Sequence, residues 1–118
     1  MPGAPSILDQ EHEDFRGTVR AFVEKEVVPF HDQWEKDGQV SREVWTKAGE
    51  AGLLCFDVDE QYGGAGVRDF RYNMVVGEEL CRVGASGPGF PVHTDIIVPY
   101  IRQLGTEEQK RRWLPGLV

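Results

Sequence analysis

The fold assignment depends on residues 53–66, LLCFDVDEQYGGAG, because this pattern is compatible with two different structures. An apolar run, a glycine loop and then a helix is an arrangement that often holds a phosphate. A dinucleotide fingerprint needs the spacing GxGxxG, however, and Asp69 stands where the third glycine would be. A carboxylate at a helix start competes with an anion for the backbone N–H groups. The stretch therefore predicts a tight turn between two helices. Its turn residues are Tyr62, Gly63, Gly64 and Gly66.

Amphipathic helices are predicted on the amino-terminal side of this turn. Apolar residues recur three or four positions apart over residues 9–38, which indicates one long helix ending near Gly38. Pro29 removes a backbone donor inside it, so we expect a kink or break there. Ser41 is a suitable N-cap for a second, shorter helix.

Helices are also predicted on the carboxyl-terminal side. Residues 69–84 form a third amphipathic helix, and residues 92–104 form a helix so apolar all round that we expect it to be buried. Residues 106–109, TEEQ, are a capping box that opens a last helix. The predicted fold class is all-α, an orthogonal or up-and-down bundle of about five helices. Residues 1–8 are predicted to be a flexible lead-in to a domain over 9–118.

Composition narrows the possible partners and compartments. The chain has 118 residues, 40% of them hydrophobic, and a net charge of -7. That charge gives no support to a nucleic-acid or anionic-membrane surface. No apolar run approaches the ~20 residues of a membrane span. Cys55 and Cys81 lie in apolar segments and are predicted to be buried free thiols, so a cytoplasmic location is the simplest expectation.

Few side chains are arranged for catalysis. His93 and Asp95 could form a pair, but a packing or capping role explains them better. His12 and His31 lie on the polar side of the first helix and are predicted to be solvated. The carboxylates near apolar segments are Glu60, Glu78 and Glu79. We assign no catalytic residue, no flavin contact and no metal ligand within these 118 residues.

Three stretches in order nevertheless resemble one family. They are EAGLLCFDVDEQYGGAG, VVGEELCRVGAS and GTEEQKRRWLPGL, the last following a segment with His93 and Pro99. Together they resemble the amino-terminal helical domain of the acyl-CoA dehydrogenases, over nearly all of residues 9–118. One departure is Asp59, where family members commonly have proline.

The resemblance implies a parent enzyme that uses FAD to convert an acyl-CoA thioester to the trans-2-enoyl-CoA. An electron-transferring flavoprotein would accept the electrons, and the parent would be a homodimer or homotetramer. In the family, the catalytic glutamate and most FAD contacts belong to a β-domain and a carboxyl-terminal helical domain. We therefore expect this chain, which stops before both, to be inactive alone and to bind no FAD.

By similarity, this domain contributes one wall of the acyl pocket. Our hypothesis for that wall is Phe90, Val92, His93 and Ile96, with ordinary core packing as the alternative for each. Two other functions compete with the dehydrogenase: a related flavin oxidase or monooxygenase, and a stand-alone helical interaction module. The module would bind its partner through an exposed end at Leu114, Leu117 and Val118.

Overall fold

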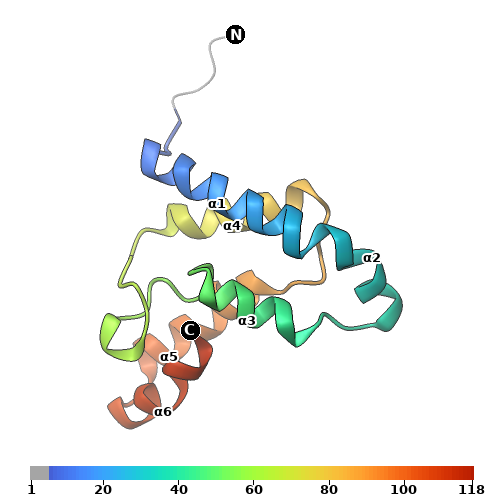
Figure 1. The fold of residues 1–118 in the computed structure, drawn as a ribbon. Helices are drawn as coiled ribbons and strands as arrows, with labels where there is room; N and C mark the ends of the chain where they lie inside the picture. Colours follow the sequence, from blue (N-terminus) through green and yellow to red (C-terminus); the bar gives the residue numbers. More distant parts are fainter. Residues whose placement is uncertain (1–5) are drawn as a thin grey trace.

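The computed structural model describes residues 6–118, and every regular element in that range is helical. The elements are α1 (Gln10–Glu26), α2 (Val28–Asp37), α3 (Arg42–Glu50), a 3-10 turn (Glu60–Tyr62), α4 (Phe70–Arg82), a π-helix (Val92–Ile97), α5 (Val98–Leu104) and α6 (Glu107–Leu117). The all-α prediction is confirmed, with six α-helices. In Figure 1, α1 and α4 lie side by side, α3 runs through the middle, and α5 and α6 form the end far from α1.

The predicted lead-in, residues 1–8, precedes the first helix in the sequence. Residues 1–5 of the predicted lead-in fall outside the described residues, and residues 6–8 carry no helix. Among residues 6–118, no helix combines the length and the apolar character needed to cross a bilayer.

The predicted long helix is broken near Pro29, as expected. Val27, at φ -116° and ψ -59°, separates α1 from α2, and Pro29 lies in the first turn of α2, where its missing N–H has no helical partner to lose. Gly38 ends α2 with φ 72°, a left-handed conformation that glycine adopts without a Cβ clash. The break turns α2 away from α1, toward α3 (Figure 1).

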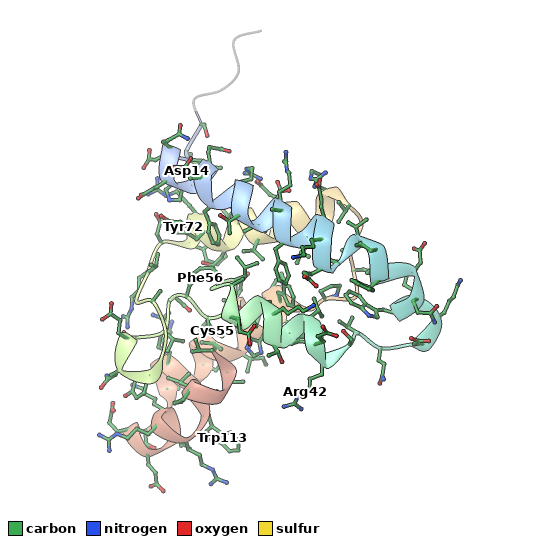
Figure 2. The ribbon with its side chains drawn as sticks, viewed as in Figure 1. Asp14, Arg42, Cys55, Phe56, Tyr72 and Trp113 are labelled. Carbon is green, nitrogen blue, oxygen red and sulfur yellow. The ribbon has the colours of Figure 1, made fainter. Side chains whose placement is uncertain are left out.

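Apolar side chains from α1, α3, α4 and the loop after α3 meet in one core. Phe56 of that loop lies 5.9 Å from Phe15 of α1 and 6.3 Å from Tyr72 of α4, measured between ring centroids (Figure 2). The largest fully buried apolar side chains are Phe90, Leu53 and Leu114. The core therefore includes α6, so both ends of the domain share one packed interior.

An ion cluster joins α1 to α4 beside this core. Glu79 of α4 is only 1% exposed and accepts hydrogen bonds from Arg16, Arg20 and Arg82 at 2.9–3.1 Å. The pKa of Glu79 is lowered to about 2, most strongly by the hydrogen bonds from the Arg20 guanidinium and further by those from Arg82 and Arg16. The carboxylate is thus held charged, with the three guanidiniums satisfying its oxygens.

The structure corrects the prediction that His12 and His31 are solvated. His12 is fully buried: its Nδ1 accepts the Asp9 N–H at 2.9 Å, and its Nε2 pairs with Asp69 at 2.9 Å. Because Nδ1 accepts, the ring carries its proton on Nε2 and donates it to Asp69. His31 is half-buried and accepts the Gly87 N–H at 3.1 Å. Both histidines lie on the polar side of their helices in the sequence pattern, but in the structure residues from distant segments bury them.

Three burial predictions are also wrong. Cys55 is buried as expected, but Cys81 is exposed on α4. The apolar segment 92–104 keeps much of its surface in solvent, as described below. Leu114, predicted to be uncovered, is 0% exposed because α6 folds back onto the core. The exposed apolar end required by the interaction module is therefore largely absent, since Leu117 and Val118 are also partly buried against the core.

Candidate functional site

The glycine turn is filled by its own hydrogen bonds. The N–H groups of Gly63, Gly64 and Gly66 donate to the carbonyls of Glu60, Asp59 and Val58 at 2.9–3.2 Å. A Cβ on Gly64 would stand 2.0 Å from the Val58 oxygen, so only glycine fits there. The turn therefore offers no row of free N–H groups to a phosphate.

The start of α4, beyond the turn, is also occupied. Asp69 caps α4 by accepting the Arg71 N–H, and the same carboxylate binds the Arg71 side chain and His12. The hydrogen bonds from Arg71, and to a smaller extent the one from His12, hold the pKa of Asp69 well below its usual range. A second anion at this helix start would face a carboxylate that is permanently charged.

The turn contacts the start of α6 instead. The hydroxyl of Tyr62 donates to Glu107 at 2.6 Å, which joins the YGG stretch to the capping box of α6. Two sequence motifs 45 residues apart thus form one contact. The residues named in the turn have a structural explanation within the domain.

The four residues of the hypothetical acyl-pocket wall lie on two different sides of the helix that carries them. Phe90 is 2% exposed and packs edge-on against Trp45 of α3, with ring centroids 4.8 Å apart. His93 lies 5.3 Å from the same indole. Val92 and Ile96 point outward and are 54% and 51% exposed. The structure therefore brings Phe90 and His93 together and separates them from Val92 and Ile96.

His93 is fixed by a contact with the end of α6. Its Nε2 donates to the Leu117 carbonyl at 2.7 Å, and the Cys55 thiol donates to the same oxygen at 3.3 Å. Burial raises the pKa of the Cys55 thiol to about 12, so it acts as a donor and not as a thiolate. His93 borders a hollow of about 680 Å³ that also touches Trp45 and Leu54.

The outward side of the same segment is an apolar face. Its exposed members are Val92, Ile96, Ile97, Tyr100 and Leu104, which we call the outer apolar face. The segment begins as a π-helix, a rare form that is frequent at functional sites and rotates successive side chains differently from an α-helix. Thr94 is turned inward, where its hydroxyl oxygen accepts the Cys55 N–H at 3.2 Å.

Sequence reasoning missed Trp45, the residue that supports both Phe90 and His93. Trp45 lies on the apolar side of α3, a position that by itself indicates only core packing. Its spacing from Ser41 gives no sign that it would meet a segment 45 residues later. Only the packing of α3 against the π-helix identifies it.

Two groups of acidic and histidine side chains approach metal-ligand spacing. They are Asp9, Glu11 and His12, and His31, Asp32 and Glu35. Both nitrogens of His12 are already engaged, and His31 Nε2 accepts the Gly87 N–H. Because Nε2 of His31 accepts, the neutral ring carries its proton on Nδ1, which lies 3.8 Å from Glu35. Neither histidine therefore presents an unprotonated ring nitrogen without a partner, which a metal site would use.

Comparison with known proteins places this arrangement in a family. A sequence profile described as the N-terminal domain of acyl-CoA dehydrogenase matches residues 9–118. The chain belongs to the acyl-CoA dehydrogenase family. The resemblance noted from the YGG and GTEEQ stretches is thereby confirmed.

Individual acyl-CoA dehydrogenases show the same likeness. The chain is 45% identical, over 98% of its length, to the mitochondrial long-chain specific acyl-CoA dehydrogenase of Rattus norvegicus. It covers 26% of that relative, so it spans about a quarter of the length of the curated relatives it matches.

Solved structures of acyl-CoA dehydrogenases have the same fold over this domain. The enzyme from Geobacillus kaustophilus superposes with a TM-score of 0.90 and 48% identity, over 97% of this chain and 30% of that one. The Bacillus anthracis acyl-CoA dehydrogenase complexed with FAD gives a TM-score of 0.82 and 31% identity, over 98% of this chain and 20% of that one.

Proposed function

We propose that this chain serves as the amino-terminal helical domain of an FAD-dependent dehydrogenase that converts an acyl-CoA thioester to the trans-2-enoyl-CoA. Membership of the family supports this activity, and relatives about four times as long as this chain support a role within a larger polypeptide. By the same resemblance, an electron-transferring flavoprotein receives the electrons, and the complete protein assembles as a homodimer or homotetramer. A cytoplasmic location stays a prediction, since one relative is mitochondrial.

The flavin fits poorly on the described residues. The N–H groups of the glycine turn are bound within the turn, and Asp69 occupies the start of α4. The buried carboxylate Glu79 is held by three arginines and has no free oxygen to act as a base. In our proposal the flavin and the catalytic base belong to other parts of the enzyme, and this domain contributes shape.

The observation that carries the proposal is the outer apolar face. Val92 and Ile96 expose about half of their surface although they are apolar and lie on one side of a short helix. Several exposed apolar side chains on one side of a helix are typical of a ligand or interaction site. We assign Val92 and Ile96 to the acyl-pocket wall, with Phe90 and His93 behind them as the layer that sets their position.

The test is a pair of substitutions in the complete enzyme. Val92→Phe and Ile96→Phe add bulk to the outer apolar face without removing any buried contact. We expect kcat/KM for the longest acyl-CoA that the enzyme accepts to fall about tenfold or more, which is the effect on kcat/KM of one or two methylenes that do not fit a hydrophobic pocket. The kcat/KM for a short acyl-CoA should not change.

The matched control is Val28→Phe, at a half-exposed valine on α2. It should leave the chain-length profile unchanged. An unchanged profile in both Val92→Phe and Ile96→Phe would remove these residues from the wall. Electron acceptance is measured separately, because rapid turnover with oxygen as sole acceptor would favour an oxidase over a dehydrogenase.

A further inference from the structure

Two irregular stretches of backbone meet behind the outer apolar face. Cys55, in the loop after α3, has φ 51°, a left-handed conformation that residues other than glycine rarely adopt. The other stretch is the π-helix Val92–Ile97, after which the Val98 N–H bonds the carbonyl of His93, five residues back. Backbone of this kind persists only where surrounding contacts hold it, and it is concentrated at functional sites.

One buried hydrogen bond joins the loop to the π-helix. The Cys55 N–H donates to the Thr94 hydroxyl oxygen at 3.2 Å, although the two residues are 39 positions apart in the sequence. Cys55 is 0% exposed and Thr94 is 3% exposed. A buried backbone N–H without an acceptor is costly. The left-handed conformation of Cys55 and the position of Thr94 therefore depend on each other.

A proline explains why the helix can open at this point. Pro99 has no N–H for the carbonyl of Asp95, four residues back, and its ring crowds that carbonyl. Bends and π turns are typical of a helix that is weakened in this way. Pro99 does not by itself choose between a bent α-helix and a π-helix. A contact from another part of the chain has to select the register, and the bond from Cys55 to Thr94 is such a contact.

The helix register determines which side chains face outward. A π turn closes its hydrogen bond over one more residue than an α turn does, and one residue of α-helix corresponds to a rotation of about 100°. Converting Val92–Ile97 to an α-helix would rotate this segment by about that angle relative to α5, which the fully buried Val98 fixes to the core. Val92 and Ile96 would then leave the outer apolar face.

We propose that Thr94 is a positioning residue that determines which acyl chain lengths the enzyme accepts. Its hydroxyl binds the Cys55 N–H and thereby selects the π register, which turns Val92 and Ile96 outward. Thr94 itself faces inward and touches no substrate. The effect on substrates rests on the proposed function, whereas the register can be measured without any substrate.

The first test measures the register in the ¹³C,¹⁵N-labelled 118-residue chain. NMR scalar coupling across hydrogen bonds identifies the carbonyl that the Val98 N–H binds, which is that of His93 in the π register. Thr94→Val keeps the shape of the side chain and removes the hydroxyl. In this variant the Val98 N–H should couple to the carbonyl of residue 94, and the Cys55 N–H should lose about tenfold or more of its hydrogen-exchange protection. Coupling that stays at His93 would overturn the proposal.

Two matched variants serve as controls. Thr94→Ser keeps the hydroxyl and removes only a methyl group, so the register and the protection of Cys55 should be those of the unaltered chain. A changed register in Thr94→Ser would overturn the proposal even if Thr94→Val does not fold. Thr18→Val removes a hydroxyl that bonds the Asp14 carbonyl within α1, and it should change neither measurement.

The second test compares two substrates of the complete enzyme. In Thr94→Val the ratio of kcat/KM for a long acyl-CoA to that for a short one should change about tenfold, mainly through KM, while Thr94→Ser keeps the ratio. A loss of folded enzyme alone would lower kcat for both substrates by the same factor and leave this ratio unchanged.

The substitutions in the acyl-pocket wall separate the two ways in which this test can fail. If Val92→Phe and Ile96→Phe change the ratio and Thr94→Val does not, the role of Thr94 is refuted and the wall stands. If none of the three variants changes the ratio, the wall is refuted, and the role of Thr94 in specificity is refuted with it.

Discussion

Replacing Glu79 with Gln should destabilise the domain far more than any other single charge change on α4. The carboxylate accepts four hydrogen bonds from Arg16, Arg20 and Arg82. Removing one partner of a buried ion pair costs about 3–5 kcal/mol. The three guanidiniums are 19%, 47% and 39% exposed and can partly return to water, so we place the loss near the lower limit, at about 3 kcal/mol.

Thermal unfolding followed by circular dichroism measures this loss. The entropy of unfolding is roughly 2.1 cal/mol/K per residue, so for a chain of this length 3 kcal/mol corresponds to a fall in Tm of about 12 °C. The effect should also depend on pH in a defined direction. Folding lowers the pKa of Glu79 to about 2, so its contribution is complete above the ordinary value of 4.5 and disappears as the pH falls toward 2. The stability gap between the two proteins should therefore narrow over that range.

The neighbouring residue provides the control. Glu78 is 52% exposed and binds only Arg16, so Glu78→Gln should cost about 0.5 kcal/mol or less, near 2 °C in Tm. Equal losses for the two variants would show that burial of Glu79 does not matter. A stability gap that stays constant between pH 5 and pH 2 would show that its charge does not matter.

Two further predictions concern the glycines and the thiols. Gly64→Ala places a methyl group 2.0 Å from the Val58 oxygen and should lower the free energy of unfolding by about 3 kcal/mol or more. Gly17 lies within α1 and a Cβ there meets no atom within 4 Å, so Gly17→Ala should raise the free energy of unfolding by about 0.5–1 kcal/mol. Melting temperatures that move in the same direction in the two variants would contradict this. Cys81 should react with a maleimide at pH 8 while Cys55 does not, because Cys55 is buried with a thiol pKa near 12; two adducts on the native chain by mass spectrometry would be the contrary result.

The helix boundaries could be predicted from the sequence because their causes are local. Gly38 ends α2, Asp69 caps α4, and the Thr106 capping box opens α6, each through contacts within three residues or through its own backbone conformation. Pro29 breaks the first helix through its own missing donor. Chemistry of this kind is complete within a few residues, so a single sequence contains it.

The burial of polar residues could not be predicted in the same way. His12 looks like a surface residue of α1, and its partner Asp69 is 57 residues away. Glu79 lies at a mid-helix position next to the exposed Glu78, and nothing nearby in the sequence distinguishes the two. Their environments are set by the packing of α1 on α4, which the helical periodicity of either segment does not specify.

The acyl-pocket wall within residues 90–96 stays a prediction. Helical spacing alone separates its members, because Phe90 and His93 are three residues apart on one side while Val92 and Ile96 are four residues apart on another. The sequence does not show which of the two sides is covered. The structure turns Phe90 and His93 toward Trp45 and leaves Val92 and Ile96 exposed, and this packing depends on a residue far away in the sequence.

The pairing of α1 with α4 also affects how the chain folds during synthesis. Arg20 and Glu79 are separated by 59 residues, so at 5–20 residues per second α1 leaves the ribosome roughly 3–12 s before its partner helix exists. During that interval Arg16 and Arg20, on the side of α1 that later packs against α4, are exposed to solvent. Two charges at that position keep an unpaired amphipathic helix soluble and discourage association with other nascent chains, and the same charges become the ion cluster once α4 arrives.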